Sequence, residues 1–211
     1  MIAAVVPAAG HSQRMGRPKL ILQVGGQTVI ARVVSALRAG GASLVVVVAP
    51  GARVAGAAIL VAEAVEAGAE VVTPEVQPPD MRSSFEHGLA FLEARHATVT
   101  TVLLTPADSP GLTSALVKQV VERALDEPSR IVAPTFNGRR GHPIALPRAL
   151  AYEVRDLPPG IGINSLVALR AALVTELAVA DPGAITDLDT PEDLERWLSG
   201  AYATTNRHED I

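Results

Sequence analysis

The chain has 211 residues, a formal net charge of −4 and no cysteine. An isoelectric point near 5.7 and the lack of a basic stripe argue against a nucleic-acid partner. Without cysteine there is no disulfide, thiolate metal site or cysteine nucleophile, which fits the reducing cytoplasm. No apolar run approaches the roughly 20 residues of a membrane helix, so we expect no membrane partner.

Apolar runs that predict buried strands alternate with segments of helical periodicity along most of the chain. The expected strands are residues 2–6, 44–49, 70–73, 98–105, 130–133, 142–146 and 172–180. The expected helices are residues 28–39, 54–66, 82–94, 113–125, 148–154, 164–170 and 190–198. This order predicts an α/β fold of three layers, Rossmann-like, with a largely parallel, mixed sheet and helices on both faces. We expect one domain over residues 1–200 and a polar tail over residues 201–211.

The first strand leads into a loop in which three small residues precede three cations. Ala8, Ala9 and Gly10 carry little or no side chain, so their backbone can approach an anion closely. The cations follow within twelve positions and are Arg14, Arg17 and Lys19. The spacing fits neither a Walker loop nor a dinucleotide fingerprint nor a nucleophile elbow. The loop therefore predicts a phosphate-binding site of another kind.

Carboxylates follow two later segments that we expect to reach the same edge of the sheet. Asp108 comes just after the strand that ends at Thr105, and Asp187 and Asp189 come after Ile185. Proteins usually hold Mg²⁺ with one or two carboxylates plus phosphate oxygens. Asp108 is therefore a candidate ligand of Mg²⁺ (or Mn²⁺), although capping a turn is the alternative role. Period-2 alternation predicts that Asp187 and Asp189 point the same way from a strand end, and either can supply the second carboxylate.

Three further motifs predict local structure, and two of them also suit a ligand. Thr190–Asp193 predicts a capping box at the last helix, and Ser83–Glu86 predicts another at the helix over residues 82–94. A helix start there also suits a nucleotide. The glycine-rich stretch Gly138–Pro143 predicts a turn between two strands, and its arginines and His142 could face an anionic acceptor.

The stretch Ala8–Leu20 resembles the MobA-like nucleotidyltransferases of molybdenum cofactor biosynthesis, whose pattern is Ala-Ala-Gly-x-Ser-x-Arg-Met-Gly-x-Pro-Lys-Leu. Residues 138–143 and 187–194 are also similar to motifs of that family, and its cytidylyltransferases resemble the chain most closely. Asp108 and Pro110 match the family's Gly-Asp-Gln-Pro, whereas Ala107 and Ser109 depart from it. Residues 157–164 carry no charge where the family often has a Gly-Asp-x-Gly element that faces the acceptor.

The resemblance implies transfer of a nucleoside monophosphate, CMP from CTP, onto a phosphorylated acceptor, with release of pyrophosphate. The implied acceptor is molybdopterin, the molybdenum cofactor precursor, and a molybdenum enzyme is the implied client. Three alternatives stay open: cytidylyl transfer to methylerythritol phosphate, guanylyl transfer to molybdopterin, and a nucleotide-binding chaperone of a molybdenum enzyme without turnover.

The motifs and the resemblance together assign the site residues. Those expected to act in catalysis are Arg14, Lys19 and Asp108. Those expected to bind the nucleotide are Ala8, Ala9, Gly10, Ser12, Arg14, Gly16, Lys19 and Ser84. Those expected to bind the acceptor are Arg140, Gly141 and His142. The expected ligands of Mg²⁺ (or Mn²⁺) are Asp108 and Asp189.

Overall fold

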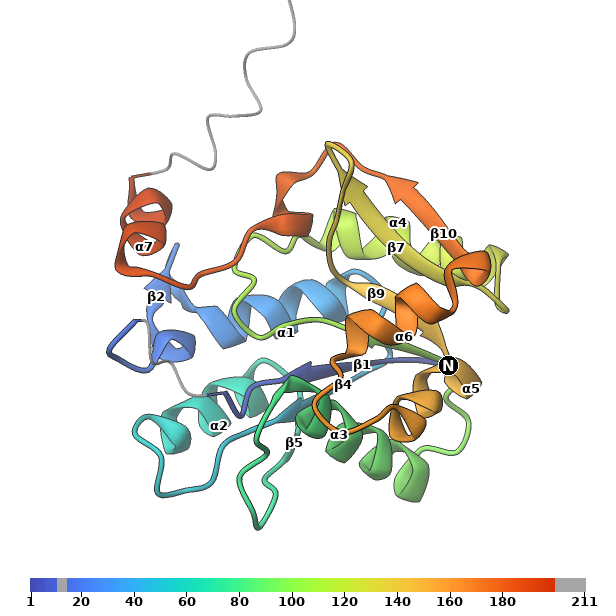
Figure 1. Cartoon of the computed structure of the whole chain (residues 1–211). Coiled ribbons are helices and arrows are strands. Elements are labelled where there is room, and N and C mark those ends of the chain that lie inside the picture. Colours follow the sequence, from blue (N-terminus) through green and yellow to red (C-terminus); the bar gives the residue numbers. More distant parts are fainter. Residues whose placement is uncertain (11–14, 200–211) are drawn as a thin grey trace, which may run out of the picture.

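A computed structural model describes residues 1–10 and 15–199 of the chain. Within these residues one sheet has the strand order β10-β7-β9-β6-β1-β4-β5, with β8 paired to β7 (Figure 1). The strands of this sheet are β1 (Ile2–Pro7), β4 (Leu44–Val48), β5 (Glu70–Val72), β6 (Thr101–Leu104), β7 (Ile131–Phe136), β8 (Arg139–Arg140), β9 (Ile144–Pro147) and β10 (Val174–Ala178). A separate small hairpin consists of β2 (Gln23–Val24) and β3 (Gln27–Thr28).

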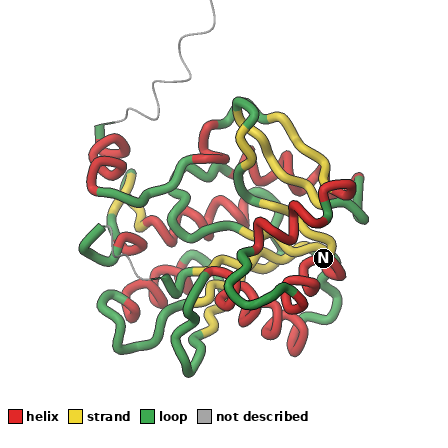
Figure 2. Tube along the Cα trace, viewed as in Figure 1, coloured by secondary structure: helices red, strands yellow, loops and turns green. Residues whose placement is uncertain are grey.

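Helices lie on both faces of the sheet, as the tube in Figure 2 shows. The α-helices are α1 (Val29–Ala39), α2 (Ala57–Glu66), α3 (Met81–Arg95), α4 (Ser114–Asp126), α5 (Arg148–Tyr152), α6 (Ile163–Leu169) and α7 (Pro191–Leu198). The short 3₁₀ helices are η1 (Lys19–Ile21), η2 (Glu153–Asp156), η3 (Ala171–Leu173) and η4 (Pro182–Ile185). The predicted three-layer α/β fold is confirmed.

Strand β1 lies in the interior of the sheet, between β6 and β4, and its direction fixes the edge at which ligands can bind. It pairs in parallel with β4 and with β6, and β4 pairs in parallel with β5. β9 runs antiparallel to β6 and to β7, which makes the sheet mixed. The carboxyl ends of β1, β4 and β6 therefore meet at one edge, where open α/β sheets bind ligands.

The two faces of β1 belong to two separate parts of the core. Ala4 and Val6 pack with buried residues of α1 and α4, whereas Ala3 and Val5 pack with buried residues of α3. Burial on both faces explains why the strands read as unbroken apolar runs. A Cβ on Gly88 of α3 would lie 2.4 Å from Cγ1 of Val5, so glycine lets α3 sit directly on β1.

Several predicted boundaries were wrong for local reasons. The helix expected from residue 54 begins at Ala57, because Gly56 at φ 80° interrupts the chain just before it. The strand expected over residues 98–105 is limited to Thr101–Leu104, and the one expected over 172–180 is preceded by η3. Ser83 and Glu86 form no capping box: Asp80 is the N-cap of α3 and accepts from the Ser83 N–H at 2.7 Å, while Glu86 pairs with Arg82.

The segment that carries Asp187 and Asp189 is no strand end, contrary to the prediction. β10 ends at Ala178, and Asp181 then caps η4, so residues 186–189 are a loop between η4 and α7. Their side chains consequently do not share one direction. The single-domain assignment stays a prediction, and the predicted tail over residues 201–211 lies outside the described residues. Among the described helices, none combines the length and apolar character that crossing a bilayer requires.

Candidate active site

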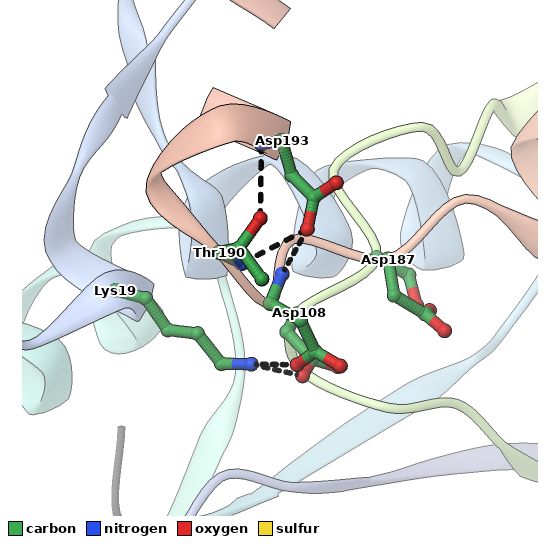
Figure 3. A network of polar contacts seen from close by, with 7 residues as sticks. Lys19, Asp108, Asp187, Thr190 and Asp193 are labelled. Atoms are coloured by element: carbon green, nitrogen blue, oxygen red, sulfur yellow. Dashed lines mark hydrogen bonds and ion pairs between the residues drawn. The ribbon is translucent and has the colours of Figure 1, made fainter. Parts of the chain in front are cut away.

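Lys19, Asp108 and Asp189 meet although they lie far apart in the sequence. Figure 3 shows the Lys19 side chain pointing toward Asp108. The Lys19 Nζ donates to Oδ2 of Asp108 at 2.6 Å and to Oδ1 of Asp189 at 2.7 Å. Burial opposes the charged form of Lys19, but Asp108 and Asp189 outweigh this effect and raise the pKa of its ammonium. Three sequence-predicted residues therefore form one cluster, with the lysine charged at neutral pH.

Each member of the cluster is held by a different element. Lys19 begins η1, and Asp108 lies four residues beyond the end of β6. The backbone N–H of Leu188 donates to the Asp108 carbonyl at 2.8 Å, which ties the loop before α7 to the loop after β6. The Asp189 N–H donates to Oδ2 of Asp193 at 3.0 Å, within the confirmed capping box of α7. The backbone of both carboxylate loops is thus fixed by hydrogen bonds.

Asp187 has surroundings of its own. Its Oδ1 accepts a hydrogen bond from the Ser109 hydroxyl at 3.2 Å, and in Figure 3 it lies apart from the Lys19 ammonium. Burial, and then the negative charge of Asp108, raise the pKa of the Asp187 carboxyl. Asp187 and Asp189 were the two candidates for the second metal-binding carboxylate. Asp189 is the one that shares the Lys19 ammonium with Asp108.

Close backbone packing at glycines holds the C-terminal loop against the rest of the site. A Cβ on Gly183 would lie 2.0 Å from the Gly111 carbonyl oxygen, and one on Gly141 would lie 2.1 Å from that of Ala184. The His142 N–H also donates to the Ala184 carbonyl at 2.8 Å. η4 therefore rests on the loops after β6 and before β9, and Gly141 supports this packing. Gly111 and Gly183 were not predicted, because isolated glycines give no signal of which backbone they will meet.

We expect Gly183→Ala to lower the free energy of unfolding by about 1–3 kcal/mol, the usual cost of overpacking. The added Cβ must push η4 away from Gly111, and the loop that carries Asp189 must move with it. Chemical denaturation and steady-state turnover measure the two effects. Gly51→Ala is the matched control for stability, because a Cβ there has no neighbour within 4 Å. Equal unfolding free energies for the two variants would contradict the packing argument.

His142 lies two residues before β9, whose first residue pairs with the last residue of β6. Burial lowers its pKa to about 4, although the nearby Asp108 charge acts in the opposite direction. The imidazole is therefore neutral at pH 7, with one nitrogen that donates and one that accepts. The Arg140 Nη2 pairs with Oε1 of Glu176 at 3.0 Å on β10, and the predicted acceptor residues Arg140, Gly141 and His142 do not line the pocket described next.

A pocket of about 230 Å³ opens beside the cluster. Its wall joins the loop after β1, the loop after β6 and the first turn of α3; the lining residues include Ala8, Gly10, Lys19, Asp108, Met81 and Ser84. The Ser84 side chain is buried, and its hydroxyl donates to the Asp80 carbonyl at 3.1 Å. A second recess of about 340 Å³ lies against α2 and shares Ala8, Gly10 and Leu20 with the first.

The structure describes the loop after β1 except for residues 11–14, and hydrogen bonds hold its first residues in place. The Ala8 N–H donates to the Val48 carbonyl at 2.9 Å. Gln77, which was not predicted, donates from its amide to the Ala9 carbonyl and accepts from the Gly51 N–H at 3.3 Å. No motif marks this glutamine, so only its place in the fold reveals it. Gly16 lines the second recess at φ 66°; the predicted Ser12 and Arg14 lie outside the described residues.

The carboxylates fit a divalent cation that also binds a substrate. Oxygen atoms of Asp108 and Asp189 already converge on one positive charge, the Lys19 ammonium. Among the described residues, no group of three or more histidine, cysteine or acidic side chains could hold a metal alone. Two carboxylates suit Mg²⁺ or Mn²⁺ when phosphate oxygens complete the coordination.

Comparisons with known proteins identify relatives that match almost the whole chain. The chain is 27% identical over 203 residues to a probable molybdenum cofactor guanylyltransferase of Mycobacterium marinum, covering 92% of this chain and 91% of the relative. A nucleotidyl transferase from Methanothermobacter thermautotrophicus has a TM-score of 0.78 and 25% identity, covering 98% of this chain and 99% of that one. Rv0371c of Mycobacterium tuberculosis in complex with manganese has a TM-score of 0.73 and 26% identity, covering 94% and 98%.

The family model that matches is that of the MobA-like NTP transferase domain, and it spans residues 4–177. The match includes Lys19 and Asp108 and ends before Asp189, which reaches the site through η4 and the loop before α7. A match of this length shows the family. The chain belongs to the MobA-like NTP transferases and is a nucleotidyltransferase.

Proposed function

We propose that this nucleotidyltransferase transfers CMP from CTP to a phosphorylated acceptor, molybdopterin, and releases pyrophosphate. The observation that carries the proposal is the meeting of Lys19, Asp108 and Asp189 beside a pocket that Ala8 and Gly10 help to line. Cationic and metal-binding groups at one end of such a pocket suit a triphosphate. The named molybdenum cofactor relative supports the choice of acceptor.

The reaction needs no covalent bond to the protein. An oxygen of the acceptor phosphate attacks the α-phosphorus, a new P–O bond forms, and the bond to the β-phosphate oxygen breaks. Asp108 and Asp189 would hold Mg²⁺ or Mn²⁺, which when bound supplies charge neutralisation at the phosphates. Lys19 neutralises the departing pyrophosphate, and the backbone at Ala8–Gly10 approaches the nucleotide closely. Neutral His142, near Asp108, can donate a hydrogen bond to the acceptor.

We expect CTP to exceed GTP in kcat/KM by about tenfold, the order that pocket size alone can supply. A pocket of about 230 Å³ favours the smaller base, and the buried Ala9 lies between Ala8 and Gly10, which line that pocket. The resemblance implies that a glycine in place of Ala9 accompanies guanylyl transfer. Guanylyl transfer is the main alternative, because the Mycobacterium marinum relative is named a probable guanylyltransferase. Ala9→Gly should therefore shift the ratio toward GTP. A wild-type ratio that favours GTP would contradict the assignment of the base.

A pyrophosphate-release screen tests the function as a whole. CTP and GTP are each combined with molybdopterin and with methylerythritol phosphate, at saturating Mg²⁺ and then Mn²⁺. We expect the fastest release with CTP and molybdopterin. Tight nucleotide binding without release in any combination would favour a nucleotide-binding chaperone of a molybdenum enzyme instead.

A further inference from the structure

Gln77 connects three loops that follow the parallel strands β1, β4 and β5. Its side-chain amide donates to the Ala9 carbonyl in the loop after β1, and its Oε1 accepts from the Gly51 N–H in the loop after β4 at 3.3 Å. Gln77 itself lies in the connection from β5 to α3. The amide cannot be turned around, because its oxygen would then face the Ala9 oxygen. The bond to Ala9 therefore needs a donor, and the bond to Gly51 needs an acceptor.

The connection that carries Gln77 has little conformational freedom. Pro78 and Pro79 follow directly, and a proline restricts both its own φ and the backbone of the residue before it. Asp80 then caps α3, because its side chain accepts from the Ser83 N–H at 2.7 Å. Gln77 is thus held from its C-terminal side. Its side chain passes this fixed position on to the loop after β1.

The hydrogen bond to the Ala9 carbonyl sets the direction of the next backbone N–H. The peptide that joins Ala9 to Gly10 is trans, and the carbonyl and N–H of a trans peptide point in opposite directions. Because the Ala9 carbonyl points to Gln77, the Gly10 N–H points away from Gln77. Gly10 lines the pocket that contains Lys19 and Asp108, whereas Gln77 does not. Glycine has no side chain, so an anion in this pocket can approach its N–H closely.

We propose that Gln77 is a positioning residue for the nucleotide: it holds the Ala9–Gly10 peptide so that the Gly10 N–H faces a phosphate of the nucleoside triphosphate. Lys19 lines the same pocket and is charged, so both groups bind the same polyphosphate chain. This inference rests on the proposed function, which places the nucleotide at Ala8–Gly10, and it adds a residue that stands in no motif. Gln77 acts only through the Ala9 carbonyl.

The test compares Gln77→Glu and Gln77→Leu in the full chain, with molybdopterin as the acceptor. An ionised carboxylate accepts from the Gly51 N–H but cannot donate to the Ala9 carbonyl, so Gln77→Glu removes only the proposed contact. We expect the KM values of CTP and GTP each to rise by about tenfold, the order of one hydrogen bond to a charged group. The kcat and the acceptor KM should change by less than about threefold. Gln77→Leu removes both bonds and should raise the nucleotide KM at least as much.

Gln119→Glu is the matched control for the added negative charge. Gln119 is exposed on α4, which packs on the face of β1 opposite to α3. Solvent and salt screen a charge at such a surface, so we expect the nucleotide KM values to stay within about twofold of those of the wild type. A rise as large as that in Gln77→Glu would attribute the loss to long-range repulsion and overturn the proposal.

Inorganic tripolyphosphate, which has neither base nor ribose, tests the phosphate contact by itself. Its Kd, measured by calorimetry, should rise by about tenfold in Gln77→Glu. Equal Kd values for the variant and the wild type, or no binding by the wild type, overturn the proposal. A loss in Gln77→Leu but not in Gln77→Glu would assign the effect to Gly51 and also overturn it. If the wild-type protein releases no pyrophosphate, the proposed function fails, and the tripolyphosphate titration still decides about Gln77.

Discussion

Replacing Asp108 with asparagine is expected to lower kcat by about 100-fold or more, the order assigned to a lost metal contact. Asparagine keeps the shape of the side chain and removes the charge that faces Lys19 at 2.6 Å. The fold should survive, because the Asp108 backbone carbonyl still accepts the Leu188 N–H. Steady-state kinetics over a range of Mg²⁺ and Mn²⁺ concentrations measure the loss.

Two neighbouring carboxylates supply the controls for Asp108. Asp189→Asn should be milder, because a neutral carbonyl oxygen can still bind the ion. Asp187→Asn should change kcat least, because Asp187 faces Ser109 rather than Lys19. Normal turnover of Asp108→Asn at limiting metal would mean that Asp108 only caps its turn.

Lys19→Met should reduce kcat/KM for the nucleotide by about 100-fold, as expected when a charged contact to the reacting phosphates is lost. Methionine preserves the apolar stem, so the 14%-exposed side chain can still pack. The loss should appear both in nucleotide affinity, by calorimetry, and in turnover.

Arg17→Met is the matched control for Lys19. Arg17 belongs to the same loop but lines the second recess beside α2, away from Asp108. We expect its kcat/KM to stay within about threefold of the wild-type value. A folded Lys19→Met protein with unchanged kinetics would reduce the loop after β1 to a surface turn.

The sequence predicted the elements whose signals are local. The apolar runs that alternate with helical segments indicated the sheet. Because Asp108 follows a buried strand, the sequence also predicted that Asp108 lies at the ligand-binding edge of the sheet. Thr190 and Asp193 predicted the start of α7 correctly, because a capping box depends only on residues three apart. At α3 the same reasoning chose Ser83, although Asp80, three residues earlier, forms the cap.

The features that the sequence did not reveal depend on tertiary contacts. Asp189 reaches Asp108 only because η4 packs through Gly183 onto Gly111, and no spacing rule encodes that approach. Arg140 lies in a motif, yet Glu176 of a strand far along the chain pairs with it. Gln77 and Arg82 stand in no motif, and their hydrogen bonds to distant loops appear only in the folded chain.

Label transfer distinguishes direct nucleotidyl transfer from hydrolysis and from nucleotide binding without turnover. The wild-type protein is incubated with CTP labelled at the α-phosphate, molybdopterin and Mg²⁺, and the products are separated and weighed by mass spectrometry. We expect the label on molybdopterin, as one CMP per molecule, in amounts equal to the pyrophosphate released. Label that stays in CTP, or that appears as free CMP while molybdopterin is unchanged, would contradict it.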